Sequence, residues 1–445
     1  MFFLYSILLT IAFIVLLPRF LFDALFKGKY AAGFFQRLGF VPRFDGAGKK
    51  VIWLHCVSVG ETNAARPLAI GLKKEFPDSR LIVSTTTRTG QQLARSIFAD
   101  IADLVFYFPF DWKSTVRRSL RRLRPSVVLL METEIWFNFI REASISGAGV
   151  AIVNGRLSER SLRRFAYIRQ FMRRVLSFLD LALVQEKVDA TRLMSLGLRA
   201  SKVKVTGNLK FDHDFNEREA GLTTEFRARF GITPDAPLII GASTHAPEEQ
   251  WITDAFKEVW KSAGEKLPRL MIAPRHPERF EDVAEIIKKT GFTWIRRSEA
   301  ASHLDKSAEI ILLDSIGELR AAYPLAEIVF VGGSLIKHGG QSVLEPAASG
   351  RAIIIGPHTH NFHAVVTEFV GRGALLQLPE VADDSQWVGR LSETLGQLLE
   401  NVEQRRKLGE NAAATIEAGA GATAETMKHL RPLINSSRKL RAGIP

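Results

Sequence analysis

Two successive series of short apolar segments are the feature that most constrains how this chain folds. Each segment is nearly continuous in apolar residues rather than alternating, and amphipathic helical patterns fill most of the gaps. Such segments are typical of parallel strands covered by helices on both faces. The first series comprises 51–57, 80–86, 104–108, 126–133, 149–154, 181–185 and 203–207, and the second comprises 237–244, 269–276, 309–315, 327–334 and 351–357.

Two such series predict two doubly wound, Rossmann-like α/β domains, because a chain of 445 residues is too long to fold around a single hydrophobic core. Two domains of this kind facing each other across a cleft are common among nucleotide-sugar glycosyltransferases. Ligands of open α/β sheets bind beyond the carboxyl ends of the strands. We expect an N-terminal domain at 26–210, a C-terminal domain at 211–435 and a loose tail at 436–445.

The charge of the chain is unevenly distributed. Residues 1–210 hold 33 Lys and Arg against 15 Asp and Glu, and residues 211–445 hold 27 against 32. A basic half favours nucleic acid or an anionic membrane surface as a partner. Its arginine clusters, at 113–124 and 160–174, lack a nucleic-acid-reading motif, so we expect lipid headgroups and no nucleic acid. The single cysteine, Cys56, excludes a disulfide framework.

The first 17 residues carry no charged side chain. As a helix they would reach about 26 Å, a little short of the ~30 Å hydrocarbon core of a bilayer. A signal peptide is the alternative, but the segment lacks a basic start and a small-residue cleavage site. Basic residues follow the apolar run, which orients the rest of the chain to the cytoplasm. We therefore expect a membrane anchor at 1–25 that spans the bilayer or lies in its interface.

The strand ends of the second half carry groups suited to a nucleotide. Glycine pairs and a helix starting near Ser342 follow the strand at 327–334, and such turns admit a close backbone approach and bind anions. Glu345, in the first turn of that helix, either complements the helix dipole or accepts hydrogen bonds from ribose hydroxyls. Arg275 suits phosphate, His276 is a ligand or a helix cap, and helix capping does not explain His245.

The strand ends of the first half carry carboxylates. Glu61 follows a strand and a glycine turn, and it either caps the next helix or takes part in chemistry. Glu132 and Glu134 end a second strand, and Asn154 and Arg156 end a third. One of the two glutamates can pair with Arg156, which is the structural alternative to a catalytic role.

Nine ordered blocks between residue 55 and about residue 348 resemble the 3-deoxy-D-manno-octulosonic acid (Kdo) transferases of lipopolysaccharide inner-core assembly. The blocks are HCVSVGE, METEIW, VNGRLS, TGNLKFD, ASTH, PRHPERF, DSIGEL, VGGSL and HGG…LEPA. The chain differs from the usual family pattern at Cys56, Phe137 and Pro247.

The resemblance implies a GT-B fold, a CMP-Kdo donor and a lipid A precursor as acceptor. It also implies an inverting enzyme on the cytoplasmic face of the inner membrane, without a metal or cofactor. By motif match, Glu61 is the catalytic base and Glu134 a second essential carboxylate. The CMP half of the donor is assigned to Arg275, His276, Gly333, Ser334 and Glu345. The other substrate-binding candidates are Ser58, Gly60, Asn154, Arg156, Lys210, His245 and Gly340.

Two other classes of function remain open at this point. A nucleotide-sugar epimerase shares the fold, but it needs neither a lipid anchor nor a basic half. A non-enzymatic membrane scaffold gives no reason for glycine-rich strand ends.

Overall fold

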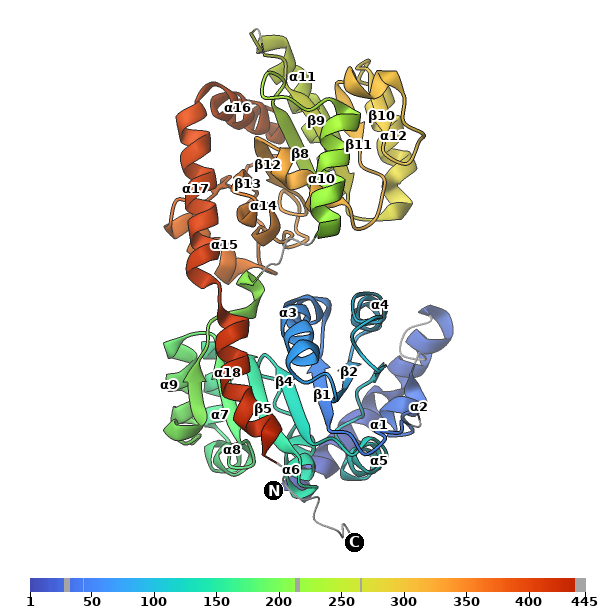
Figure 1. The fold of residues 1–445 in the computed structure, drawn as a ribbon, viewed down its shortest axis with the longest axis vertical. Helices are drawn as coiled ribbons and strands as arrows, with labels where there is room; N and C mark the ends of the chain where they lie inside the picture. Colours follow the sequence, from blue (N-terminus) through green and yellow to red (C-terminus); the bar gives the residue numbers. More distant parts are fainter. Residues whose placement is uncertain (28–32, 43, 213–216, 265, 437–445) are drawn as a thin grey trace. The chain divides into compact units, whose positions relative to one another are not determined.

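The chain forms two compact α/β units in a computed structural model (Figure 1). One unit is Met1–Asp212 together with the segment from Gly419 onward, and the other is His213–Ala418. Residues 437–445, most of the predicted loose tail, lie outside the described residues. The structure describes residues 1–27, 33–42, 44–212, 217–264 and 266–436.

The first unit is built on a parallel sheet whose order, within the described residues, is β3-β2-β1-β4-β5-β6-β7. All seven strands of the first predicted series are therefore confirmed. They are β1 (Val51–Cys56), β2 (Arg80–Thr85), β3 (Leu104–Tyr107), β4 (Val127–Met131), β5 (Gly149–Gly155), β6 (Leu181–Val184) and β7 (Val203–Val205).

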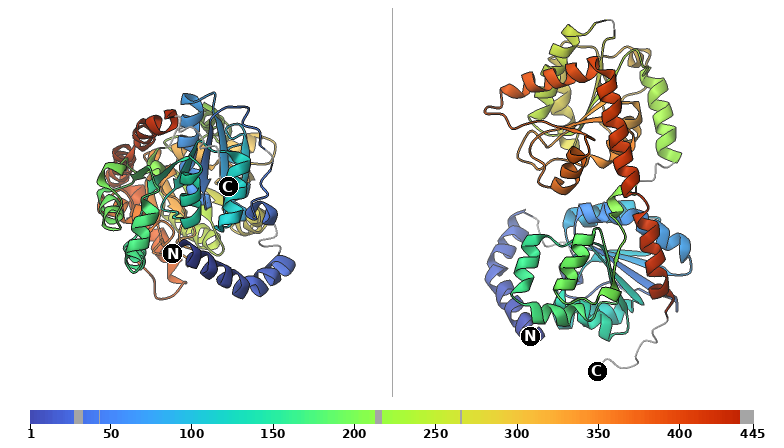
Figure 2. Two further views of the ribbon diagram at one scale, coloured as in Figure 1. Left: turned by 90° about the horizontal axis from the view of Figure 1, so that it is seen from below. Right: turned by 90° about the vertical axis from the view of Figure 1, so that its left-hand side faces the viewer.

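Helices cover both faces of this sheet, as the continuous apolar strands predict (Figure 2). Along β1, Val51 and Trp53 join one buried core, while Ile52 and Leu54 join the other. The helices between or beside the strands are α2 (Phe34–Arg37), α3 (Val59–Glu75), α4 (Arg88–Ile97), α5 (Lys113–Leu123), α6 (Phe137–Ile145), α7 (Glu159–Ala166), α8 (Arg169–Leu176) and α9 (Lys187–Ser195). The 3-10 turns η1 (Ala200–Lys202) and η2 (Leu209–Phe211) flank β7.

The C-terminal helix α18 (Ala422–Asn435) belongs to the first unit, whereas the sequence analysis places it in the second. Its buried side chains, among them Met427 and Leu430, complete the core beneath α3. The carboxylate of Asp212 accepts hydrogen bonds from the backbone N–H groups of Gly421 (2.6 Å) and Thr423. The sequence shows that this terminal helix has an apolar face to bury, but it does not show which domain buries that face.

The N-terminal helix α1 (Phe2–Lys27) lies against the first unit by one face. The Phe2 and Phe171 ring centroids are 5.0 Å apart, and the Tyr5 hydroxyl donates a 2.9 Å hydrogen bond to Asp111. The opposite face is apolar and exposed, as at Phe3 and Ile11. Among the described residues, no helix has both the length and the apolar character needed to cross a bilayer.

The second unit also contains a parallel sheet, with the order β10-β11-β9-β8-β12-β13-β14 within the described residues. The five predicted strands are present, and the short edge strands β10 and β14 were not predicted. The strands are β8 (Leu238–Thr244), β9 (Arg269–Pro274), β10 (Trp294–Arg296), β11 (Ile310–Leu312), β12 (Ile328–Val331), β13 (Ala352–Ile355) and β14 (Leu376–Gln377).

The helices of the second unit cover its sheet (Figure 1). One core joins β8, β9 and β12 to side chains such as Phe256 and Trp387. The α-helices are α10 (Glu217–Phe230), α11 (Glu248–Ser262), α12 (Phe280–Lys288), α13 (Leu319–Ala322), α14 (Leu344–Ala348), α15 (His363–Gly371), α16 (Gln386–Glu400) and α17 (Val402–Gly419). Short 3-10 turns are η3 (Pro277–Arg279), η4 (His303–Lys306) and η5 (Tyr323–Leu325).

Candidate active site

Carboxylates and amides gather at the carboxyl ends of β1, β4 and β5, which are neighbours in the first sheet. Glu132 directly follows β4 and has a φ of 52°, and Asn154 in β5 has a φ of 56°. Left-handed backbone at residues other than glycine is strained, and such strain is concentrated at functional sites. This edge of the sheet is therefore a candidate catalytic site.

Glu61 serves both as a helix cap and as a perturbed acid. The Ser58 side chain accepts a hydrogen bond from the Glu61 N–H, while the Glu61 carboxylate accepts bonds from the Val57 N–H (2.7 Å) and the Ser58 hydroxyl (3.0 Å). This is a variant of the capping box. Glu61 is only 6% exposed, and its burial, reinforced by the charges of Glu132 and Glu134, raises its pKa to about 8.

A lysine is held among these carboxylates. Lys210 Nζ lies 2.9 Å from Glu132 Oε1, and both side chains are 28% exposed. The Asn208 side chain accepts a hydrogen bond from the Lys210 N–H, which fixes the turn that carries the lysine. Burial and the charge of Glu132 raise the pKa of Glu134. The structure thus brings Glu61, Glu134 and Lys210 into one electrostatic group, with Lys210 rather than Arg156 as the partner of Glu132.

Asn154 links the strand end to the lysine-bearing turn. Its side-chain oxygen accepts a 2.9 Å hydrogen bond from the Leu209 N–H, and the residue is fully buried. The Arg156 N–H donates to the Thr133 hydroxyl at 2.8 Å, which ties the segment after β5 to the one after β4. The Arg156 side chain is exposed. Gly60 is exposed as well, and a Cβ at this position would meet only Ser58 Oγ, at 3.9 Å.

Three histidines meet at the strand ends of the second unit. The ring of His245 lies 4.1 Å from that of His338 and 5.3 Å from that of His276, between centroids. Burial, followed by the charges of His338 and His276, lowers the pKa of His245 to about 4. His245 is therefore neutral at pH 7, and its Nε2 atom is buried without a hydrogen-bond partner among the described residues.

Arg275 and Glu345 share this region. The Arg275 N–H donates to the Thr244 carbonyl at 3.0 Å, and its side chain is exposed. Burial raises the pKa of Glu345, against the opposing charges of Arg320 and Arg275, with the charge of Glu219 adding to the rise. Glu345 Oε1 lies 3.7 Å from Arg320 Nε. Arg275 therefore lies within electrostatic reach of both His245 and Glu345.

The glycine turn after β12 is already filled by a side chain of the protein. The fully buried carboxylate of Glu248 accepts hydrogen bonds from the N–H groups of Gly333 (2.7 Å), Ser334 (3.0 Å), Leu335 (3.0 Å) and His245 (3.0 Å). Successive amides of this kind form an anion-binding nest. The Gly333 and Ser334 amides are thus engaged within the protein, whereas Gly340 donates its N–H to the Gly333 carbonyl at 2.7 Å.

Sequence reasoning missed Glu248 and His338 as residues of the site. Glu248 looked like an ordinary acidic residue in a first helical turn, and nothing in its local sequence indicates a nest 85 residues further on. His338 lies in the HGG block, directly before a glycine pair, which was a usable signal. No group of three or more His, Cys, Asp or Glu suited to a metal ion occurs among the described residues, and metal independence stays a prediction.

The fold is shared with nucleotide-sugar enzymes. A UDP-GlcNAc 2-epimerase from Neisseria meningitidis, solved with UDP-GlcNAc, is similar over 86% of this chain and 100% of its own, with a TM-score of 0.56 and 15% identity. Identity this low shows the fold alone. The two parallel sheets therefore define an α/β protein with the same fold as this epimerase.

Sequence relatives show the family to which the chain belongs. The 3-deoxy-D-manno-octulosonic acid transferases of Haemophilus influenzae and Bordetella pertussis are each 32% identical to this chain, over 91% and 88% of it and 92% and 91% of their own lengths. The family model described as 3-deoxy-D-manno-octulosonic-acid transferase matches residues 32–213. The chain belongs to the 3-deoxy-D-manno-octulosonic acid transferase family and is a glycosyltransferase. The resemblance inferred from sequence is confirmed.

Proposed function

We propose that the chain transfers Kdo from CMP-Kdo to a hydroxyl group of a lipid A precursor, with inversion and with Glu61 as the general base. Membership of the family supports the sugar that is transferred. The observation that carries the chemistry is the position of Glu61, a buried carboxyl at a strand end whose pKa is raised to about 8. A base works best when its pKa lies near the working pH, and a well-placed one contributes about 10²–10⁴-fold in rate.

The proposed transfer forms one bond to the anomeric carbon and breaks another. The acceptor oxygen forms a bond to the anomeric carbon while the bond from that carbon to the CMP phosphate breaks, and its electron pair stays on the phosphate oxygen. Attack opposite the departing phosphate inverts the anomeric configuration. The hydroxyl proton passes to the Glu61 carboxylate. Glu134 and Lys210 set the charge around this proton transfer and bind the acceptor, together with Ser58, Gly60 and Arg156. Buried Asn154, predicted from sequence to bind substrate, instead holds the turn that carries Lys210.

The departing CMP gains negative charge and needs stabilisation. Among the described residues, the Arg275 guanidinium has no acidic partner at ion-pair distance, which leaves it available to a phosphate. Neutral His245 and exposed His276 supply further donors beside it. Glu345 accepts the ribose hydroxyls, while Gly333 and Ser334 act as the frame of the site, since their amides are held by Glu248.

We also propose that the protein works on the cytoplasmic face of the inner membrane, attached through α1. The helix uses one face to contact the first unit and exposes large apolar side chains on the other, among them Phe3, Ile7, Ile11 and Val15. A docked helix with an exposed apolar face suits an interfacial anchor better than a spanning one. Salt-sensitive co-sedimentation with anionic vesicles tests this part.

Product analysis tests the proposed reaction directly. The full-length protein is incubated with CMP-Kdo and a lipid A precursor, and mass spectrometry and CMP release are followed together. We expect one CMP released for each Kdo attached. The same protein incubated with UDP-GlcNAc should give no epimer, which separates the proposal from the epimerase that shares its fold. Absence of both products would contradict an enzymatic role and favour the scaffold alternative.

A further inference from the structure

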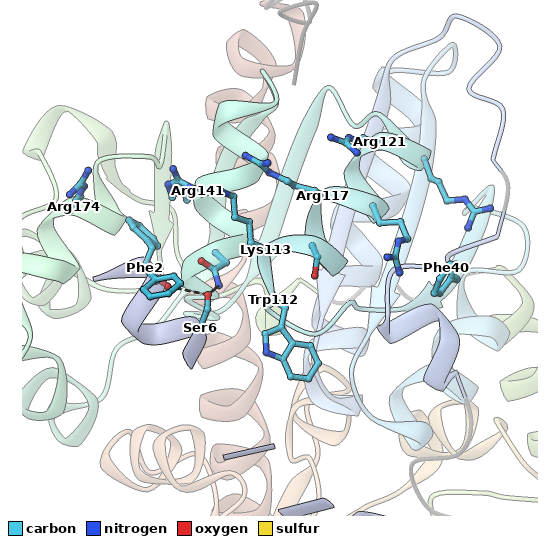
Figure 3. A pocket seen from close by; sticks show the side chains of 14 residues that line it. Phe2, Ser6, Phe40, Trp112, Lys113, Arg117, Arg121, Arg141 and Arg174 are labelled. Atoms are coloured by element: carbon cyan, nitrogen blue, oxygen red, sulfur yellow. Dashed lines mark hydrogen bonds between the residues drawn. The ribbon is translucent and has the colours of Figure 1, made fainter. Parts of the chain in front are cut away.

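A large cavity in the first unit lies between the start of α1, the arginine-rich helix α5 and the helix α6 (Figure 3). Its volume is about 1110 Å³. Its lining contains none of the residues assigned above to the active site. The lining residues are Phe2, Phe3, Ser6, Phe40, Trp112, Lys113, Ser114, Arg117, Arg118, Arg121, Arg122, Asn138, Arg141 and Arg174.

The lining is strongly cationic and, among the described residues, includes no acidic side chain. Its basic side chains are Lys113, Arg117, Arg118, Arg121, Arg122, Arg141 and Arg174. Buried Glu142, behind the lining, takes up part of this charge, because it pairs with Arg117 at 2.7 Å and with Arg141. Among the described residues, Lys113, Arg122 and Arg174 have no acidic side chain at ion-pair distance. Such a concentration of cationic groups, with two guanidinium groups and one ammonium unopposed, favours a phosphate ligand.

The same cavity has an apolar border. Phe3 is 79% exposed and Phe40 is 48% exposed, and Trp112 contributes a third aromatic ring. Beyond Phe3, the exposed apolar face of α1 continues through Leu4, Ile7, Leu8 and Ile11. A free phosphate or a nucleotide has no acyl chain to pack against this apolar surface, whereas a phospholipid carries both a phosphate and acyl chains.

We propose that this cavity is a binding site for the phosphate headgroup of an anionic membrane phospholipid, whose acyl chains lie along the exposed face of α1. The proposal rests on the membrane attachment proposed above and adds a defined lipid site to it. The occupant is a structural lipid of the bilayer rather than the sugar acceptor, because Glu61, Glu132, Glu134 and Lys210 do not line the cavity.

Monomeric dihexanoylphosphatidylglycerol, kept below its micelle concentration, tests the site without a bilayer. Full-length protein is titrated with this lipid, with dihexanoylphosphatidylcholine and with inorganic phosphate. One variant combines Lys113→Gln, Arg121→Gln and Arg174→Gln, which are exposed side chains of the cavity. A matched control combines Arg163→Gln, Arg164→Gln and Arg169→Gln, which are also exposed, lie outside the cavity and remove the same charge.

We expect saturable binding of one phosphatidylglycerol, weaker binding of phosphatidylcholine, and at least about a tenfold loss of affinity in the cavity variant alone. Equal losses in both variants, or equal binding of the two lipids, would overturn the proposal. Displacement of the lipid by an equal concentration of inorganic phosphate would make this a general anion site and overturn it too. CMP binding measured on the same samples keeps the two proposals apart, because its failure with intact lipid binding concerns only the transferase function.

Discussion

Lys210 Nζ lies 2.9 Å from Glu132 Oε1, beside Glu61, whose pKa is raised by burial and by the charges of Glu132 and Glu134. The lysine charge offsets the Glu132 charge, which is one of the causes of the raised pKa. The Lys210–Glu132 pair therefore influences the pKa of the proposed base, Glu61, from the end of the neighbouring strand β4. This arrangement predicts that, beyond the effect of burial, residues that do not touch the transferred proton adjust the pKa of Glu61.

Replacing Lys210 by Met tests this coupling. Without the lysine, the charge of Glu132 acts on Glu61 unopposed, so the pKa of Glu61 should rise and the ascending limb of the pH–rate profile should move to higher pH. Lys204→Met removes the same charge at an exposed position of the same unit and should leave the limb in place. A change in KM for the acceptor without any movement of the limb would reduce Lys210 to a substrate contact.

The raised pKa of Glu61 also predicts how stability depends on pH. The carboxyl titrates near its ordinary value of 4.5 in the unfolded chain and at about 8 in the folded protein. Between these values the folded state holds a proton that the unfolded state has released, so stability falls as pH rises from about 5 to 8. Glu61→Gln cannot titrate, and the variant should gain stability relative to the wild type over this window.

Denaturant unfolding of both proteins from pH 5 to pH 9 measures this difference. Subtracting one curve from the other removes the contributions of other titrating groups, such as Asp111, whose pKa burial raises to about 7. A difference that stays constant over the whole range would show that the pKa of Glu61 is not raised.

The nest around Glu248 predicts an indirect effect on the nucleotide. Glu248→Gln replaces one carboxylate oxygen by an amide that cannot accept, which leaves backbone N–H groups of the glycine turn without partners. Each hydrogen bond to a charged group is worth about 1.5–3 kcal/mol. We expect CMP affinity to fall about tenfold or more as the turn shifts.

Glu258→Gln is the matched control for this substitution. Glu258 lies on the same helix, α11, and its carboxylate forms a surface pair with Lys261 at 2.9 Å. Its replacement should leave CMP affinity unchanged. Calorimetry with CMP compares the two variants, and unchanged affinity in folded Glu248→Gln protein would confine Glu248 to a structural role.

Glu345→Ala tests the direct contact with the nucleotide. If Glu345 accepts the ribose hydroxyls, CMP binding should weaken by roughly 1.5–3 kcal/mol. Glu327→Ala, which removes a carboxylate paired with Arg405 at 2.9 Å elsewhere in the second unit, should have no such effect. An unaltered CMP affinity in Glu345→Ala would leave Glu345 as a partner of Arg320 alone.

The sequence predicts the sheets of this protein better than its polar contacts. Strands such as Val127–Met131 are continuous apolar runs, and that pattern depends only on local residues. The place of α18 and the nest of Glu248 depend on contacts between segments far apart in the chain, which no local pattern records. Glu61 lies between these cases. Its place after a strand is visible in the sequence, whereas its pKa depends on burial and on the charges of Glu132 and Glu134.

The rate of Kdo transfer by Glu61→Gln tests the central claim most directly. The glutamine oxygen can still accept the hydrogen bond from the Val57 N–H, so the helix start should persist, whereas the amide cannot take up a proton. We predict that the variant folds and binds CMP as the wild type does, and that it loses at least ~10²-fold in transfer rate from CMP-Kdo to a lipid A precursor. Near-normal turnover by Glu61→Gln, together with an inactive Glu134→Gln variant, would contradict the account and make Glu134 the base.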